Sequence, residues 1–160
     1  MKRIVLCVSA VALASSLGTP RSSSQALAAE SAPAPKATNA SCALVTKAEA
    51  EAILGEPLDD LTSPLEHSCD YGHKPDRPHL LMTELRTGMT KSSFESQTQN
   101  AAKVTGAKLK PAPGYGEQAV WIGTSQIVVL QHGKAFSVRP DKKVAPAKLD
   151  AFLRKALGRL

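Results

Sequence analysis

The segment 118–139 most strongly constrains the fold, because it contains three strand-like runs joined by very short turns. The runs cover residues 118–122, 126–131 and 134–139. The turns between them are Gly123-Thr124-Ser125 and His132-Gly133, and connections this short join antiparallel neighbours. The segment therefore predicts an antiparallel sheet in which alternate side chains face a core.

Two capping boxes predict helices upstream of these strands. Thr46 and Glu49 have the spacing at which each side chain bonds to the other residue's backbone N–H, and Gly55 is typical of the end of the helix that they begin. Ser92 and Glu95 repeat the pattern and predict a second helix that runs to about residue 104. The second helix is rather polar, so we expect it to lie across the surface of a sheet with one narrow apolar stripe.

The remaining elements complete an α+β arrangement. Strands are predicted at 68–71 and 79–86, and a last helix begins at Pro146 and keeps an apolar stripe to residue 160. The order is then α-β-β-α-β-β-β-α. We therefore predict an α+β fold, with an antiparallel sheet of about five strands and helices packed on it.

The first 28 residues are predicted to be a signal peptide. Met1-Lys2-Arg3 supplies the positive charge, an apolar run extends from Ile4 to Ala14, and Ala26-Leu27-Ala28 suits the cleavage site. The apolar run is too short to span a bilayer, so no transmembrane anchor is expected after cleavage. We expect an exported protein, of the periplasm or the extracellular space.

The cysteines outside the signal peptide predict a disulfide. Residues 29–40 are rich in Ala and Pro and are predicted to form a disordered linker, which leaves 41–160 as a single domain. Cys7 belongs to the signal peptide, so Cys42 and Cys69 remain. Two cysteines in an exported domain most simply pair with each other, and such a bridge contributes about 3–4 kcal/mol by chain-entropy arithmetic.

The charge of the mature chain gives no support to nucleic-acid binding. Three of the 20 basic residues precede the predicted cleavage site and all 14 acidic residues follow it, so the formal charge falls from +6 to about +3. Nucleic-acid binding requires a dense basic stripe, with stacking aromatics for single strands. Aromatic residues make up 4% of this chain. We therefore expect no nucleic-acid partner.

Four short motifs follow one another along 41–160. They are Cys42-Ala-Leu-Val-Thr-Lys-Ala-Glu49, Ile53-Leu-Gly-Glu-Pro57, Cys69-Asp-Tyr71 and Pro113-Gly-Tyr-Gly-Glu-Gln-Ala-Val-Trp121. This layout resembles a family of small exported bacterial proteins of unknown function, many of which are lipoproteins. The resemblance implies an α+β sandwich of the type seen in exported PsbP-like domains, and a Cys42–Cys69 bridge. The chain departs from the family because Cys7 lacks a lipobox, so the resemblance does not extend to lipid anchoring.

The tract 67–79 contains three of the four histidines, His67, His73 and His79. Imidazoles with nearby carboxylates suit zinc or copper, so a periplasmic metal-binding protein is one hypothesis. None of the usual short-range ligand pairings occurs here, and a disulfide at Cys69 would remove the thiolate. A polar hairpin tip with solvated histidines is the simpler interpretation.

Tyr115, Glu117 and Trp121 are the candidate ligand-binding residues. Gly114-Tyr115-Gly116-Glu117 has the composition of a loop that closes over a ligand, although its glycines also suit a turn into a strand. Trp121 is the single tryptophan. An inward ring would be part of the core, which we expect, whereas an outward ring would stack on a sugar or mark a partner surface.

No catalytic residues are predicted. Gly123-Thr124-Ser125-Gln126 is not a nucleophile elbow, and both domain cysteines are assigned to the bridge. We therefore expect a non-catalytic module of the cell envelope that uses a sheet face or a helix–sheet cleft, with no cofactor. Its partner is expected to be a protein, an envelope component or a small ligand. The alternatives are the metal-binding protein, and a hydrolase whose residues meet only in the fold.

Overall fold

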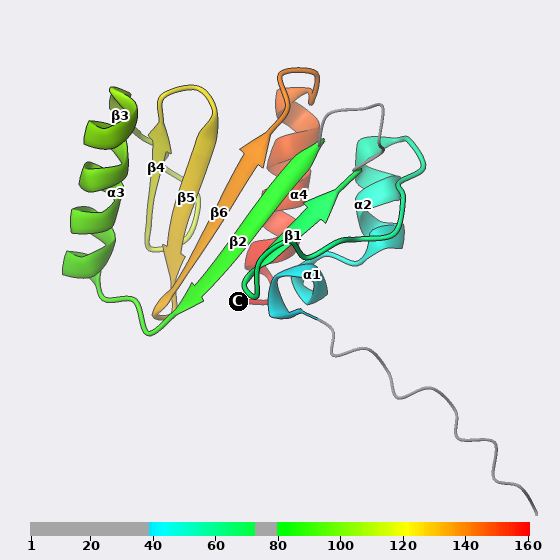
Figure 1. Ribbon diagram of the computed structural model, residues 1–160, viewed down its shortest axis with the longest axis horizontal. Helices are drawn as coiled ribbons and strands as arrows, with labels where there is room; N and C mark the ends of the chain where they lie inside the picture. Colours follow the sequence, from blue (N-terminus) through cyan, green and yellow to red (C-terminus); the bar gives the residue numbers. More distant parts are fainter. Residues whose placement is uncertain (1–38, 73–79) are drawn as a thin grey trace, which may run out of the picture. The chain divides into compact units, whose positions relative to one another are not determined.

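The computed structural model describes residues 39–72 and 80–160, which form an antiparallel sheet with helices on both faces (Figure 1). The predicted signal peptide, residues 29–38 of the predicted linker, and His73 and His79 lie outside the described residues. The α+β class predicted from the hairpins is confirmed.

The sheet has six strands in the order β1-β2-β6-β5-β4-β3, and all neighbours are antiparallel. The strands are β1 (Ser68–Tyr71), β2 (Leu81–Thr87), β3 (Leu109–Pro111), β4 (Gln118–Ile122), β5 (Gln126–Gln131) and β6 (Lys134–Pro140). The helices are α1 (Ala40–Leu44), α2 (Lys47–Leu54), α3 (Lys91–Thr105) and α4 (Pro146–Leu157). The expectation of five strands and three helices therefore missed α1 and β3. None of the described helices is long and apolar enough to cross a membrane.

The helix starts follow local hydrogen bonding, and one prediction was wrong. Thr46 and Glu49 form the expected capping box of α2, and Gly55 ends that helix in a left-handed conformation with φ of 72°. Helix α3 is capped by Thr90 and Ser93 rather than by Ser92 and Glu95. The Ser93 hydroxyl accepts from the Thr90 backbone N–H at 2.9 Å, so a serine completes the box where glutamate was expected.

The β5–β6 turn explains the register of the hairpin. His132 and Gly133 have φ angles of 48° and 69°, so both central residues adopt the left-handed conformations that match the twist of paired strands. Gln131 consequently pairs with Lys134, and each further pair follows in step. The predicted hairpin is confirmed.

The larger core lies between the sheet and the layer formed by α1, α2 and α4, which we call the α4 layer (Figure 1). Tyr71 and Phe152 are fully buried at its centre, with their rings edge-on and the centroids 5.0 Å apart. The Tyr71 hydroxyl donates to the Val45 carbonyl at 2.8 Å. Burial, with a smaller contribution from the charge of Glu49, raises the pKa of this phenol, so the hydroxyl remains a donor.

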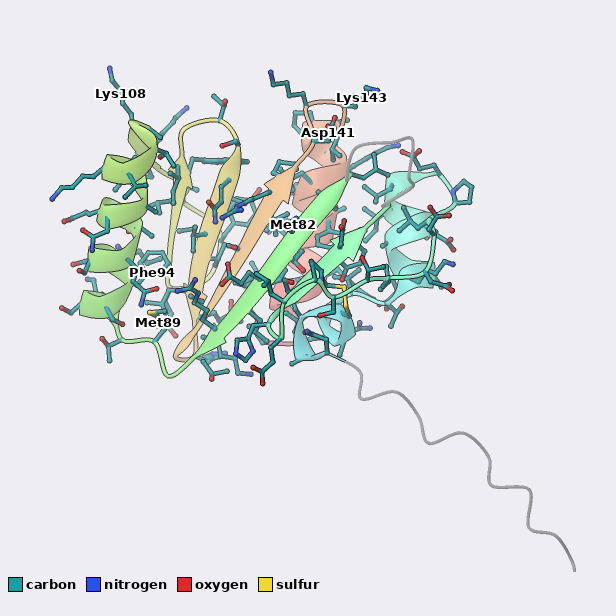
Figure 2. All side chains as sticks on the ribbon, in the orientation of Figure 1. Met82, Met89, Phe94, Lys108, Asp141 and Lys143 are labelled. Atoms are coloured by element: carbon teal, nitrogen blue, oxygen red, sulfur yellow. A yellow bond between two sulfur atoms is a disulfide. The ribbon has the colours of Figure 1, made fainter. Side chains whose placement is uncertain are left out.

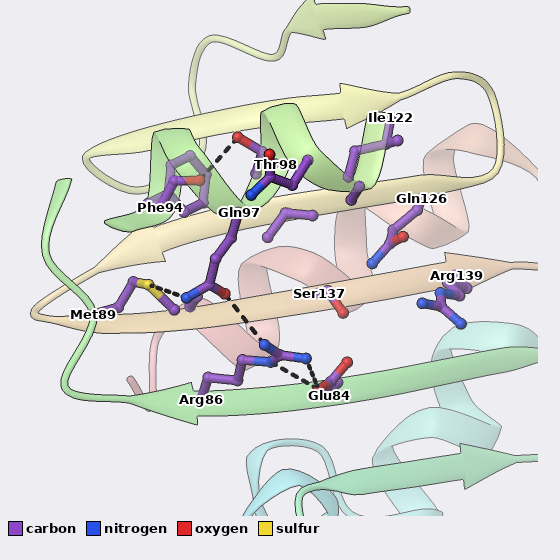
Figure 3. A pocket seen from close by; sticks show the side chains of 14 residues that line it. Glu84, Arg86, Met89, Phe94, Gln97, Thr98, Ile122, Gln126, Ser137 and Arg139 are labelled. Atoms are coloured by element: carbon purple, nitrogen blue, oxygen red, sulfur yellow. Dashed lines mark hydrogen bonds and ion pairs between the residues drawn. The ribbon is translucent and has the colours of Figure 1, made fainter. Parts of the chain in front are cut away.

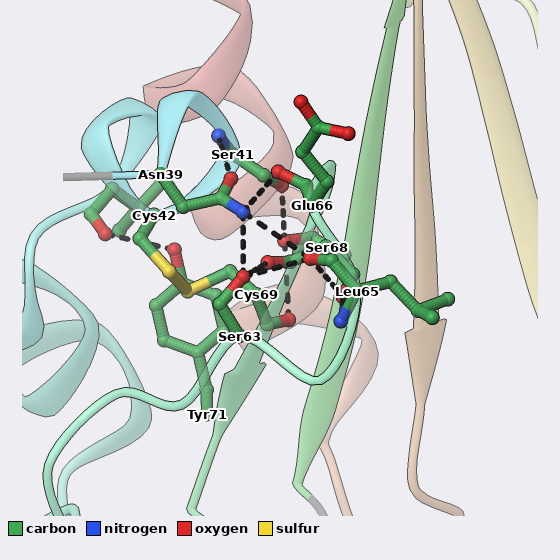
Figure 4. Close-up of a disulfide and its surroundings, with 11 residues drawn as sticks. Asn39, Ser41, Cys42, Ser63, Leu65, Glu66, Ser68, Cys69 and Tyr71 are labelled. Atoms are coloured by element: carbon green, nitrogen blue, oxygen red, sulfur yellow. Dashed lines mark hydrogen bonds between the residues drawn. A yellow bond between two sulfur atoms is a disulfide. The ribbon is translucent and has the colours of Figure 1, made fainter. Parts of the chain in front are cut away.

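The predicted disulfide between Cys42 and Cys69 is present and joins α1 to β1 (Figure 4). Asn39 extends this connection, because its side-chain amide donates to Ser63 and to the carbonyls of Leu65 and Glu66. The N-terminal end of the described domain is therefore attached covalently and by hydrogen bonds to the edge of the sheet.

The smaller core lies on the opposite face of the sheet, under α3 alone. Phe94 is its largest buried side chain, and Met89 lies beside the start of the helix (Figure 2). Helix α3 packs on β3, β4 and β5. The strands β6 and β2 therefore have no described helix above them on this face, where Met82 is only half-buried.

Candidate functional site

A cleft of about 570 Å³ opens between α4 and the β4–β5 end of the sheet, and we call it the α4 cleft. Its buried lining includes Leu149 and Leu153 of α4. Exposed Ser125, from the β4–β5 turn, and Lys142, from the β6–α4 loop, line it as well. A concave apolar surface with a few polar groups is the usual form of a small-molecule site.

Trp121 lines the α4 cleft from β4. It packs against the larger core but is only half-buried, so its ring contributes to the core and to the cleft wall. No acceptor among the described residues takes a hydrogen bond from the indole N–H, and this atom is not sealed from solvent. Trp121 therefore presents an apolar ring and a free donor to the cleft.

Tyr115 reaches the same cleft from the β3–β4 loop, and α4 holds it in place. Its hydroxyl donates to Asp150 at 2.7 Å, and the Arg154 guanidinium lies 5.6 Å from the centroid of its ring. The hydrogen bonds from Arg154 and Tyr115 hold the pKa of Asp150 below its ordinary value. Burial and the bond to Asp150 raise the pKa of Tyr115. At neutral pH the pair is therefore a phenol bound to a carboxylate.

The backbone beside Tyr115 has a structural requirement for glycine. Gly116 has φ of 56°, and a Cβ at this position would lie 2.6 Å from the Leu130 carbonyl oxygen. No side chain is accommodated at that distance, so the loop passes close to β5 only with glycine here. The close approach directs the chain from Tyr115 into β4.

Glu117 does not line the α4 cleft. It is exposed, and its carboxylate accepts a hydrogen bond from the His132 backbone N–H at 2.8 Å. Its own N–H donates to the Leu130 carbonyl at 2.9 Å. Glu117 therefore ties the β3–β4 loop to the β5–β6 turn, whereas Tyr115 and Trp121 meet in the cleft.

The histidine tract is described only in part. His67 is exposed, and its Nε2 lies 3.9 Å from a carboxylate oxygen of Glu66. His73 and His79 lie outside the described residues. Within 39–72 and 80–160, no group of three or more His, Cys, Asp or Glu side chains is arranged to hold a metal ion. The metal-binding hypothesis therefore stays a prediction.

Asp150 and Lys142 also line the α4 cleft, and nothing in the sequence marks either of them as a site residue. Asp150 is 35 positions from Tyr115 along the chain, and no local pattern signals that the two meet. The one available signal is its position on α4, because an acidic residue next to Leu149 must lie at the border of the apolar stripe.

Comparisons with protein-family models, with curated proteins and with solved structures find no match. The resemblance to small exported bacterial proteins therefore rests on the sequence motifs alone. Any functional argument must come from the site itself.

Proposed function

We propose that this protein is an exported, non-catalytic binding module of the cell envelope or extracellular space, and that it holds a small ligand in the α4 cleft. The expected signal peptide and the Cys42–Cys69 bridge support an oxidising compartment. A helix–sheet cleft is one of the two binding surfaces, with a sheet face, that the sequence leads us to expect.

One observation carries the proposal: Tyr115 and Trp121 converge on one cleft from different segments, and only the Tyr115 hydroxyl has a hydrogen-bond partner among the described residues. The Tyr115 hydroxyl is occupied by Asp150, which fixes the phenol ring. The Trp121 indole N–H has no acceptor among the described residues. A fixed ring beside a free donor lowers the ordering cost of binding and leaves one directional contact for the ligand.

The lining defines the chemistry of the ligand. The side chains of Trp121, Leu149 and Leu153 favour a ligand with an apolar or flat face. The indole N–H requires a hydrogen-bond acceptor on that ligand, and Lys142, which has no side-chain partner in the described part of the chain, favours an acceptor that is negatively polarised.

The test uses Trp121 as its own probe, because it is the single tryptophan of the chain. The mature protein is recovered from the exported fraction and measured by native mass spectrometry, and any bound molecule is then extracted and returned to the stripped protein. We expect an added mass in the native spectrum and a shift of the tryptophan emission on return of the extract.

Two variants locate the binding site. Trp121→Phe keeps an aromatic ring but removes the N–H. The fraction of protein that carries the added mass should therefore fall about tenfold at limiting ligand. Lys103→Gln changes an exposed cation of α3, on the opposite face of the sheet, and should leave occupancy unchanged. A protein recovered without added mass, whose emission does not respond to the exported-fraction extract, would overturn the proposal.

A further inference from the structure

A second groove lies on the other face of the sheet, between α3 and the strands β6 and β2 (Figure 3). We call it the α3 groove, and its volume is about 270 Å³. It exists because α3 covers only the half of this face that is formed by β3, β4 and β5. Phe94, Val128 and Ala135, all buried, supply its apolar lining.

One end of the α3 groove is occupied by a complete network of side chains. Arg86 pairs with Glu84 at 2.8 Å, and its guanidinium also donates to Gln97 of α3 at 3.2 Å. The Gln97 amide in turn lies 3.6 Å from the Met89 sulfur. The charge of Arg86 is therefore balanced within the protein, and this end offers little to an ion.

From Glu84 towards its other end, the groove presents three polar side chains that bond to nothing in the described structure. They are Gln126 of β5 and Ser137 and Arg139 of β6. The register of β5 and β6 brings them together. Gln126 and Arg139 are the residues next to the Ile127–Val138 pair on their two strands, and Ser137 lies two residues from Arg139 on the same face. Figure 3 shows Gln126 and Arg139 beyond the Arg86 network, with Ser137 between them and Glu84, its partner across the β2–β6 pair.

We propose that the α3 groove binds a small amphiphile with one carboxylate. The carboxylate pairs with Arg139 and accepts further hydrogen bonds from the Gln126 amide and the Ser137 hydroxyl. The aliphatic part lies along Phe94 and Val128. This site is separate from the α4 cleft, which lies on the opposite face of the sheet, and it does not depend on the function proposed there.

The charges select a carboxylate with an apolar body over other ligands. A guanidinium presents parallel N–H donors that match the two oxygens of a carboxylate, and amide and hydroxyl donors nearby add specificity. Because Arg86 is already neutralised, a second negative charge on the ligand would meet Glu84 without compensation. The volume equals that of about nine water molecules in the liquid, which limits the ligand to a short chain.

The test uses octanoate, with octanol and acetate as matched probes that lack the charge or the chain. Isothermal titration calorimetry of the mature, oxidised protein should show octanoate binding at least tenfold more tightly than either control. Amide chemical shifts should move at Gln126, Val128 and Ser137, and should not move at Trp121 and Asp150 of the α4 cleft.

Variants then assign each part of the ligand to its end of the groove. Arg139→Gln should weaken octanoate about tenfold or more and remove the preference over octanol. Arg139→Lys should retain part of the affinity, because the ammonium group carries the positive charge but lacks the parallel N–H donors of the guanidinium. Ala101 is a half-buried residue of α3 that lines the groove. Ala101→Leu fills part of the groove and should weaken the binding of octanoate without changing the weak binding of acetate. Lys142→Gln is the matched control in the other cleft and should change nothing.

Three outcomes would overturn the inference. They are no preference for octanoate over octanol, equal octanoate affinity in the wild type and Arg139→Gln, and shift changes confined to the α4 cleft. The thermal unfolding midpoint of each variant shows that a loss of binding is not a loss of folding. Failure here leaves the function proposed for the α4 cleft untouched, because that test uses Trp121 and different variants.

Discussion

The two faces of the sheet are attached to their helices in different ways. The α4 layer is joined by the Cys42–Cys69 bond, by the Tyr71–Phe152 contact and by an ionic network. In that network Glu49 of α2 pairs with Lys155 of α4 at 3.0 Å and with Arg159 beyond its end. The single helix α3 is held by a smaller apolar cluster.

The helices on the two faces of the sheet differ in how strongly they are cross-linked. Lys148 of α4 also donates to the Leu54 carbonyl at the end of α2, so the α4 layer is cross-linked within itself as well as to the sheet. On the other face, α3 is polar apart from a narrow stripe, and it leaves a groove with unsatisfied donors. We therefore expect the α4 layer to contribute more to the stability of the fold than α3 does.

The largest expected effect comes from a matched pair of core truncations. Phe152→Ala should lower the free energy of unfolding by about 4–5 kcal/mol, because it leaves a cavity and removes the edge-on contact with Tyr71. Phe94→Ala, in the smaller core, should cost about 3 kcal/mol. Urea unfolding followed by circular dichroism measures both. Equal losses, or a larger loss for Phe94→Ala, would contradict the division between the layers.

The second prediction removes the covalent link of the α4 layer. The double variant Cys42→Ala/Cys69→Ala should lower the free energy of unfolding by about 3 kcal/mol, because the bridge limits the unfolded chain over a separation of 27 residues. Reduced wild-type protein is the control and should lose a similar amount. Hydrogen exchange should accelerate more in α1 and β1 than in α3. Equal acceleration of exchange on both faces would contradict the claim that the bridge stabilises the α4 layer more than it stabilises α3.

The smallest expected effect concerns pH and the Glu49 network. Hydrogen bonds from Arg159, the Thr46 backbone and Lys155 hold the pKa of Glu49 well below its ordinary value of 4.5. A carboxyl whose pKa is lower in the folded state stabilises the fold fully above its unfolded-state pKa, and this contribution is lost as pH falls towards the folded-state value. Glu49→Gln should therefore be less stable than the wild type at pH 7, and the difference should shrink by pH 3.

Urea midpoints at the two pH values measure this effect. Glu56→Gln is the matched control, because Glu56 has no side-chain hydrogen bond or ion pair in the described structure. Its midpoint should follow the wild type at both pH values. A stability difference for Glu49→Gln that does not change between pH 7 and pH 3 would show that the network contributes nothing through the charge of Glu49.

Local signals predicted the parts of the fold that form within a few residues. His132-Gly133 determines the register of β5 and β6, and Thr46 with Glu49 determines the start of α2. The same local reasoning failed at α3, because Ser93 completes the capping box with Thr90 two residues earlier than expected. It also failed for β3, whose three residues are all exposed and include a proline, so that no pattern marks them as a strand.

The candidate sites were predictable only in part. Trp121 and Tyr115 stand out by residue type, but Glu117 stood beside them in the sequence and has a structural contact instead. Gln126, Ser137 and Arg139 were not predicted as a site, because none of them stands out in the sequence by residue type or spacing. The three side chains form a candidate site only because β6 lies between β2 and β5 and because α3 packs on β3, β4 and β5 and leaves β6 open.

The sequence by itself determined the α+β class, the hairpins and the two cysteines that form the bridge, because each depends on turn chemistry, hydrophobic period or residue type. Only the tertiary structure decided that β2 pairs with β6, that α3 alone covers one face, and that residues 115, 121 and 150 meet. These pairings join segments far apart in the chain. They are selected by the burial of both helix layers at once, which no short stretch of sequence encodes.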